Sequence, residues 1–227
     1  MRPDWEKTQN RELGYWLWHF TEHTPFTNRD QVLGYMYHWG RQQARQCGLP
    51  GTYGIVGLPL DELLAGSILD VGCGPVSVHE LRPRARVTAI DPLMHRYIGA
   101  MPNISRWKGQ NDTEYLAGDI HGASLMHRSF DIVWCYNVLD HANDWRSTLA
   151  RCCEFVGVGK MLVVGVDCRE ALDDTMAMHP SVVPYNDLIT EVEKGGLSIG
   201  WITSRSKKQK QRVGLWADRT NSSTGRL

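Results

Sequence analysis

From residue 66 onward, the 227-residue chain alternates short apolar runs with amphipathic helical stretches. This alternation is typical of parallel βα units, because strands buried on both faces are apolar throughout while the crossover helices are apolar on one side only. The expected strands are Ser67–Val71, Arg86–Ile90, Asn111–Leu116, Phe130–Tyr136, Lys160–Val166, Leu197–Ser204 and Arg212–Ala217. The sequence therefore predicts an α/β fold with a doubly wound, mostly parallel seven-stranded sheet.

The last two expected strands are separated only by the polar segment Arg205–Gln211. This segment is too short for a crossover helix, so we expect a C-terminal antiparallel hairpin at the edge of the sheet. Apolar spacing predicts one helix at Asp144–Val156 and another around Leu188–Val192, which ends at the Gly195-Gly196 pair.

The N-terminal part of the chain has a different texture. Val32, Tyr35, Met36 and Trp39 are spaced by three and four residues, as on one face of a helix. We therefore predict an N-terminal helical cap at 1–47 and a glycine- and proline-rich linker at 48–65. The α/β domain follows at 66–220, and a flexible tail at 221–227.

Composition and charge exclude several classes of protein. The 25 Lys and Arg residues cancel the 25 Asp and Glu residues, so no global basic field attracts nucleic acid or anionic lipid. Apolar runs such as Met161–Val166 are far shorter than the roughly 18 residues of a membrane span. Met1–Asn10 is polar and unlike a signal peptide. The 6 cysteines form no Cys-x-x-Cys pair and predict reduced, buried thiols in a cytoplasmic protein without a metal site.

A glycine bend after the first expected strand carries the most specific chemistry. The apolar strand leads through Gly72 and Gly74 toward an expected helix, and glycines there let the backbone approach a ligand closely. Asp91 ends the next strand 19 residues after Gly72, where a carboxylate can accept hydrogen bonds from both hydroxyls of a ribose. Asp119 follows the third strand, where an adenine amino group could be bound.

These residues resemble the motifs of the class I S-adenosylmethionine-dependent methyltransferases, over roughly residues 66–217. Asp70-x-Gly72-x-Gly74 resembles the first motif, Asp91 the ribose-binding acid and Asp119 the adenine-contacting acid. Ser129–Val133 followed by Asn137–His141 is similar to the fourth-strand motif. The resemblance implies S-adenosyl-L-methionine as cofactor, bound by Asp70, Gly72, Cys73, Gly74, Asp91, Pro92, Asp119, Ile120, Asn137 and Val138.

The third family glycine is replaced by Val76 or Ser77, and this replacement also disfavours a dinucleotide-binding dehydrogenase. Three alternatives stay open. Asp91 could instead cap a helix before Pro92, and Asp119 could be a solvated loop acid. A methyltransferase-like module that binds the nucleoside or a partner protein without turnover would keep the same motif.

Within the fourth-strand motif, two residues are candidates for catalysis. His141 follows the strand at the carboxyl edge of the sheet, and an ordinary imidazole is mostly neutral at pH 7, so His141 is the candidate general base for a hydroxyl acceptor. It could instead only hydrogen-bond the start of the following helix. Asp140 could orient the imidazole, contact the substrate or cap a turn.

The acceptor is expected to be a small molecule, because the sequence lacks features of two other classes of methyltransferase. Amino-methyltransferases that act on nucleic-acid bases resemble one another in an Asn/Asp-Pro-Pro-aromatic tetrapeptide, whereas this chain has Asn137-Val138-Leu139-Asp140, so nucleic acid is unlikely. A metal-assisted enzyme would need carboxylates such as Asp140 and Asp167, but Cys168 replaces the matching asparagine. The motif and the aromatic leader resemble bacterial enzymes that methylate sugars, lipids or secondary metabolites, which implies O-methylation by in-line displacement.

The cap and the segment after the fifth strand supply candidate acceptor contacts, namely Trp16, His19, Tyr37 and His179. For each cap aromatic the alternative is simple packing against the domain. The sequence makes no prediction of oligomeric state.

Overall fold

The computed structural model describes residues 5–23, 26–47, 49, 60–122, 125–169, 179–207 and 210–219. Most of the predicted linker and the predicted tail lie outside these residues and stay predictions. The helices are α1 (Trp5–Trp18), the π-helix η1 (His19–His23), α2 (Arg29–Gln46), α3 (Leu60–Leu63), α4 (Met94–Ala100), α5 (Trp145–Phe155) and α6 (Tyr185–Lys194). The strands are β1 (Gly66–Val71), β2 (Ala85–Asp91), β3 (Glu114–Ala117), β4 (Phe130–Tyr136), β5 (Val156–Cys168), β6 (Ser198–Lys207) and β7 (Lys210–Asp218).

The strands form one sheet in the order β3-β2-β1-β4-β5-β7-β6. The first five strands in this order are mutually parallel, while β7 runs antiparallel to both β5 and β6. This confirms the doubly wound sheet with its C-terminal antiparallel pair. The direction of strand progression reverses between β1 and β4, and ligands of such sheets bind at this point, outside the carboxyl ends of the strands.

Several strand predictions were wrong in their bounds, and β5 begins at Val156 rather than at Lys160. β3 begins at Glu114 rather than at Asn111, because Asn111 and Asp112 have φ of 51° and 60°, a left-handed conformation that suits a turn. The predicted polar tip at Arg205–Gln211 is also too long. Residues at both of its ends continue the ladder, since Arg205 pairs with Arg212 and Lys207 pairs with Lys210.

The helix expected directly after the glycine bend is absent, and residues 75–84 form turns instead. The reason is local, because the side chain of Ser77 donates to Asp70 Oδ2 at 2.5 Å and accepts from the backbone N–H of His79 at 3.1 Å. Such side-chain bonds compete with helical backbone bonds. The N-terminal helix α2 covers this face of the sheet in its place.

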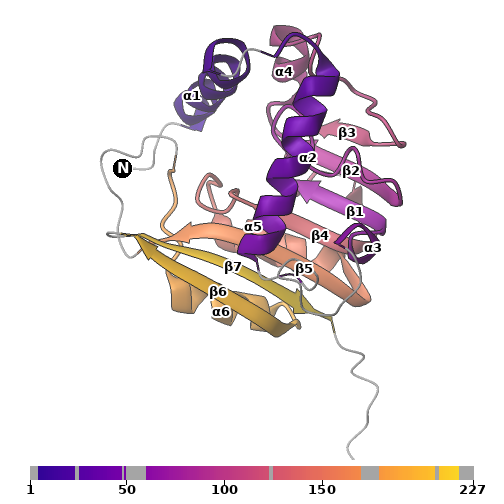
Figure 1. Ribbon diagram of the computed structural model, residues 1–227. Helices are drawn as coiled ribbons and strands as arrows, with labels where there is room; N and C mark the ends of the chain where they lie inside the picture. Colours follow the sequence, from indigo (N-terminus) through magenta and orange to yellow (C-terminus); the bar gives the residue numbers. More distant parts are fainter. Residues whose placement is uncertain are drawn as a thin grey trace, which may run out of the picture.

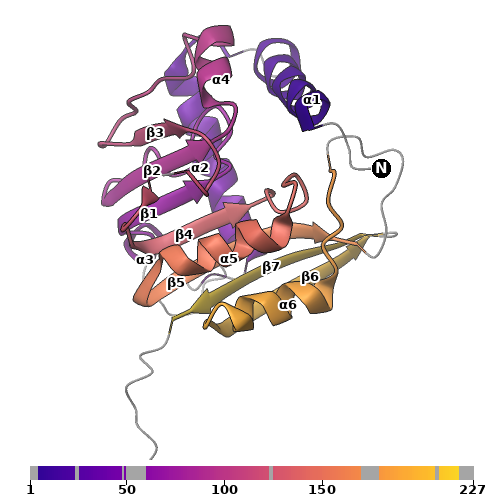
Figure 2. The same ribbon diagram turned by 180° about the vertical axis from the view of Figure 1, so that it is seen from behind.

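Helices cover both faces of the sheet. Ala44 of α2 packs with Ile68 and Trp134 of the sheet on one face, whereas Leu149 of α5 and Leu188 of α6 pack on the other. The two views show this arrangement, with α2 in front of the strands in Figure 1 and α5 and α6 in front in Figure 2. Because α2 shares the core of the sheet, residues 29–47 are part of the same packed body.

Helix α1 lies beyond the carboxyl edge of the sheet, on the side to which the arrowheads of the parallel strands point (Figure 1). Trp16 and Phe20 anchor α1 and η1, since both are buried against Leu93 and Tyr97 near α4 and against Val76. Among the described residues, no helix combines the length and apolar character that crossing a membrane requires.

Candidate active site

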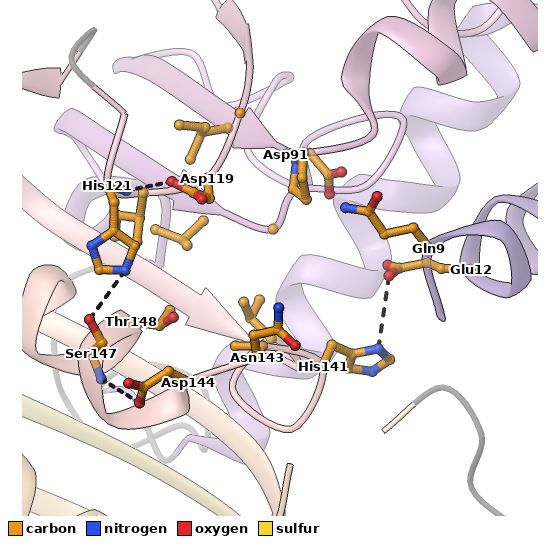
Figure 3. A pocket seen from close by; sticks show the side chains of 18 of the residues that line it. Gln9, Glu12, Asp91, Asp119, His121, His141, Asn143, Asp144, Ser147 and Thr148 are labelled. Carbon is orange, nitrogen blue, oxygen red and sulfur yellow. Dashed lines mark hydrogen bonds and ion pairs between the residues drawn. The ribbon is translucent and has the colours of Figure 1, made fainter. Parts of the chain in front are cut away.

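A pocket lies at the carboxyl edge of the sheet, between the ends of β1, β2, β3 and β4 and beneath α1 (Figure 3). Its position coincides with the switch point of the strand order. It is lined by Gln9, Glu12, Val71, Gly72, Ile90, Asp91, Pro92, Gly118, Asp119, Ile120, His121, Asn137, Val138, His141, Ala142, Asn143, Asp144, Ser147 and Thr148. Neither Lys nor Arg is among these residues.

The glycine bend forms the floor of the pocket and requires glycine at two positions. Gly72 has φ of +64°, and a Cβ there would lie 2.5 Å from Cγ2 of Val138. Gly74 has φ of +65°, and a Cβ there would lie 3.0 Å from Cζ2 of Trp16. The loop after β4 and the helix α1 therefore both approach the bend too closely for a side chain.

Asp91, at the end of β2, ties the bend to the next loop. Its Oδ2 accepts from the backbone N–H of Gly74 at 2.9 Å, and its Oδ1 accepts from that of Leu93 at 2.8 Å. Burial raises the pKa of Asp91 to about 6, against the opposing effect of these two hydrogen bonds. Asp91 thus makes the cap-like contact that was the alternative to a binding role, and it lines the pocket as well.

The adenine side of the predicted site lies at the end of β3. Asp119 and Ile120 line the pocket, and Asp119 Oδ1 accepts from the backbone N–H of His121 at 2.9 Å. The facing wall is the start of α5, where Asp144 caps the helix by accepting from the backbone N–H of Ser147 at 3.1 Å.

Asp70 and Cys73 lie behind the bend and do not line the pocket. Asp70 is only 3% exposed, and its Oδ2 accepts from Ser77. Burial raises the pKa of Asp70 to about 7, and it raises that of the Cys73 thiol well above its usual value. In this structure Asp70 therefore shapes the turn after β1 instead of facing a ligand.

His141 lies in the turn after β4, where Asn137 adopts a left-handed φ of 60°. His141 Nε2 is 3.2 Å from Nδ2 of Asn137, and His141 Nδ1 is 3.9 Å from Oε2 of Glu12. Figure 3 marks the contact between His141 and Glu12 with a dashed line. The side chain that caps the following helix α5 is that of Asp144.

Asp140 and His179 form a second layer beside His141. Asp140 Oδ2 accepts from His179 Nδ1 at 2.7 Å and lies 3.6 Å from Nη2 of Arg169. Burial opposes ionisation of Asp140, but the hydrogen bond from His179 and the nearby positive charges outweigh it and hold the pKa below its usual value. The His179 ring packs against that of His141, with centroids 4.3 Å apart.

Asp140, His141 and His179 offer ligand atoms within 4.8 Å of one another, a spacing wide enough for a metal ion. The guanidinium of Arg169 beside Asp140 opposes a second cation at this place, because both would be buried with like charge. The short Asp140–His179 hydrogen bond already uses the carboxylate oxygen that faces the ring.

The cap residues predicted to contact the acceptor are not brought to the pocket lining. Trp16 packs on Gly74, and His19 Nε2 lies 3.2 Å from the hydroxyl of Tyr35. Tyr37 is directed elsewhere, since its hydroxyl donates to Asp61 at 2.8 Å. The hydroxyl of Tyr37 is thus bonded to Asp61 outside the pocket lining, and its contact with the acceptor stays a prediction.

The sequence did not predict the lining residues that come from α1, from the segment after β3 and from the start of α5, among them Gln9, Glu12, His121, Asn143, Asp144, Ser147 and Thr148. Gln9, Glu12 and Trp16 follow one another at spacings of three and four and share one face of α1. This spacing was the available signal, but the sequence did not show that the face is turned toward the glycine bend.

The chain was compared with known proteins. Residues 69–164 match the family described as "Methyltransferase domain". These residues hold the glycine bend, Asp91, Asp119 and His141, and they form the parallel half of the sheet around the pocket. Residues 69–164 thus form a methyltransferase domain. The fold and the enzyme class predicted from the motifs are thereby confirmed.

Solved structures share the fold of this methyltransferase at low sequence identity. An O-methyltransferase family protein from Burkholderia thailandensis matches with a TM-score of 0.52 and 14% identity over 86% of this chain, which spans 60% of that protein. The N-methyltransferase NodS from Bradyrhizobium japonicum WM9 matches with a TM-score of 0.54 and 20% identity, covering 82% of this chain and 97% of NodS. The [4+2]-cyclase SpnF has a TM-score of 0.55 and 13% identity, covering 82% of this chain and 81% of SpnF. No curated protein matches the sequence.

Proposed function

We propose that this methyltransferase transfers a methyl group from S-adenosyl-L-methionine to a small molecule, at a hydroxyl oxygen, with His141 as the general base. The observation that carries the proposal is one pocket in which Gly72, Asp91 and Asp119 line one part while His141 lines another. Donor-binding and proton-accepting groups thus share a single cavity.

The pocket fits the donor. Gly72 and Val138 both line the pocket, and the missing side chain at Gly72 lets Val138 of the loop after β4 lie close against the bend. Around the donor side, the lining residues that the structure describes include the carboxylates of Asp91, Asp119 and Asp144 and neither Lys nor Arg, which suits the sulfonium and ammonium charges of the donor. When bound, S-adenosylmethionine supplies an electrophilic methyl group, and the acceptor oxygen forms a bond to its carbon as the carbon–sulfur pair of electrons leaves to sulfur.

The protein's part in this transfer is to hold two molecules in line and to remove a proton. Asp91 would accept from the ribose hydroxyls and Asp119 from the adenine amino group, while Asn137 and Val138 flank the reacting end. His141 would take the hydroxyl proton of the acceptor. Its side chain is only 15% exposed, so a bound acceptor would exclude most water from it.

Small-molecule acceptors are favoured over nucleic acid by the balanced charge and by the lack of an Asn/Asp-Pro-Pro-aromatic sequence after β4. The solved structures that share the fold include an O-methyltransferase family protein and an N-methyltransferase, so nitrogen is the second candidate for the methylated atom. The [4+2]-cyclase SpnF shares the fold and is named for a different activity, so the assay must detect methyl transfer itself.

Calorimetry tests donor binding, with S-adenosylmethionine and S-adenosylhomocysteine titrated into wild type and Asp91→Ala. We expect wild type to bind both and Asp91→Ala to lose most of the affinity. Transfer of labelled methyl groups to sugars, phenols and short RNA then identifies the acceptor class. A wild type that binds the donor and methylates none of a broad acceptor panel would favour the silent module.

His141→Ala tests the base. We expect donor affinity within a few-fold of wild type and turnover lowered at least about tenfold, because general base catalysis typically contributes 10²–10⁴-fold. Unchanged turnover would remove the base role. We propose that no metal ion takes part in the transfer, so turnover should survive dialysis against a chelator. Turnover that is lost on dialysis and restored by Mg²⁺ would show that a metal ion is required.

Cytoplasmic localisation stays a prediction. All six cysteines are buried, which fits a reducing compartment.

A further inference from the structure

His141 is held from two sides, and the second side is helix α1. Its Nε2 faces the amide Nδ2 of Asn137 at 3.2 Å, and its Nδ1 faces Glu12 Oε2 at 3.9 Å. Nδ1 is buried and makes no hydrogen bond at the present separation. Hydrogen bonds of catalytic groups are often long in unliganded proteins and tighten when ligands bind.

Glu12 is fixed in turn by its own helix. Trp16, four residues later on the same face of α1, hydrogen-bonds the Glu12 side chain and packs its ring on Gly74 of the glycine bend. The position of the Glu12 carboxylate is therefore set by the same bend that forms the floor of the donor site. Partial burial raises the pKa of Glu12, and Asp91 acts in the same direction, whereas His141 lowers it.

Asn137 and Glu12, which face the two ring nitrogens of His141, favour the same tautomer. An amide N–H of Asn137 directed at Nε2 needs a lone pair there, and a carboxylate directed at Nδ1 needs a proton there. In imidazoles the hydrogen bond of one nitrogen decides the state of the other. On this basis, and resting on the proposed function, we propose that Glu12 is the positioning residue of His141, which holds the ring as the Nδ1–H tautomer with the Nε2 lone pair directed into the pocket.

The consequence for transfer is a defined path for one proton. The acceptor hydroxyl displaces the amide of Asn137 from Nε2 and gives its proton to that nitrogen as the oxygen gains the methyl group. The resulting imidazolium is stabilised by the carboxylate of Glu12 at Nδ1, and water takes up the proton after product release. The ring of His179, held by its hydrogen bond to Asp140, packs against the ring of His141, with the two ring centroids 4.3 Å apart.

The test combines a spectroscopic readout with kinetics. Ring ¹⁵N shifts of His141 at pH 8, assigned with His141→Gln, are expected to show the Nδ1–H tautomer in wild type and a loss of that preference in Glu12→Gln. Glu12→Gln should lower kcat at least about tenfold while the affinity for S-adenosylhomocysteine changes less than threefold. Glu6→Gln, a substitution of an exposed residue on the same helix, is the matched control and should change neither.

Trp16→Phe is a second variant, which removes the indole N–H but keeps an aromatic ring on Gly74. We expect its kcat to fall between those of wild type and Glu12→Gln. The Nε2–H tautomer in wild type, or a Glu12→Gln enzyme with wild-type kcat, would overturn the inference. So would a loss of S-adenosylhomocysteine affinity in proportion to kcat, because Glu12 would then be a donor contact. The tautomer is read without turnover, so failure to find an acceptor would count against the proposed function and leave this test intact.

Discussion

Replacing Asp91 by asparagine separates its role in the fold from its role toward a ligand. Both carboxylate oxygens accept from backbone N–H groups, Oδ2 from Gly74 at 2.9 Å and Oδ1 from Leu93 at 2.8 Å. Asparagine offers one oxygen, so one buried N–H loses its acceptor, at a cost of about 1–3 kcal/mol in the free energy of unfolding.

A second effect acts in the opposite direction. Because burial raises the pKa of Asp91 to about 6, roughly two units above that of an ordinary aspartate, the ionised carboxylate costs roughly 3 kcal/mol in the folded protein above that pH. The neutral amide avoids this cost. The two effects offset each other, so Asp91→Asn should unfold in urea within about 2 kcal/mol of wild type at pH 8.

The effect of Asp91→Asn on the affinity for the donor has no opposing contribution of this kind. Ribose hydroxyls that donate to a carboxylate make charge-assisted hydrogen bonds of about 1.5–3 kcal/mol, which corresponds to a roughly 10- to 150-fold loss of affinity at pH 8. Calorimetry with S-adenosylhomocysteine measures it. Below pH 6 the wild-type carboxyl takes up a proton, so the gap between wild type and Asp91→Asn should narrow toward pH 5. Affinities that agree within twofold at pH 8 would refute the assignment of Asp91 to the ribose.

Three further substitutions test the framework of the site. Gly72→Ala should lower the free energy of unfolding in urea by about 2–4 kcal/mol, since φ of +64° and the 2.5 Å approach to Val138 both disfavour a Cβ; an unchanged urea midpoint would contradict the geometry. Arg29→Ala should cost about 3–5 kcal/mol in the same assay, because Glu80 Oε2, 2.6 Å from the guanidinium, would be left as a buried carboxylate without a cation. Burial raises the pKa of Asp70 to about 7 and that of Asp91 to about 6, so the stability of wild type should fall between pH 5 and pH 7 as the unfolded chain ionises first, and Asp70→Asn should make this fall smaller by about 2 kcal/mol. Equal slopes in wild type and Asp70→Asn would show that another group titrates there.

The sheet could be predicted because its determinants are local in sequence. Apolar runs such as Ile68–Val71 are buried on both faces, and the short tip between the last strands leaves only a hairpin. Asp91 could be assigned for the same reason, since a strand end fixes where the carboxylate lies. The helix expected after Gly74 could not be excluded, because its absence depends on the side chain of Ser77 bonding Asp70 and on α2 covering the face.

The contribution of α1 to the site could not be predicted in this way. Glu12 reaches His141 only because Trp16 packs on Gly74, a contact between residues 58 positions apart that no periodicity encodes. The direction of the Asp70 side chain could not be predicted either. Its motif resembles a cofactor-binding one, but its carboxylate is buried and accepts from Ser77, a contact that depends on the packing of the turn after β1.

The central claim is that a nucleoside donor binds over the glycine bend with its sugar at Asp91. A crystal structure of the protein soaked with S-adenosylhomocysteine measures this directly. We predict ribose hydroxyl oxygens within hydrogen-bond distance of Asp91 and the sulfur on the His141 side of the pocket. Nucleoside density elsewhere, with both Asp91 oxygens bonded only to the backbone, would contradict the account.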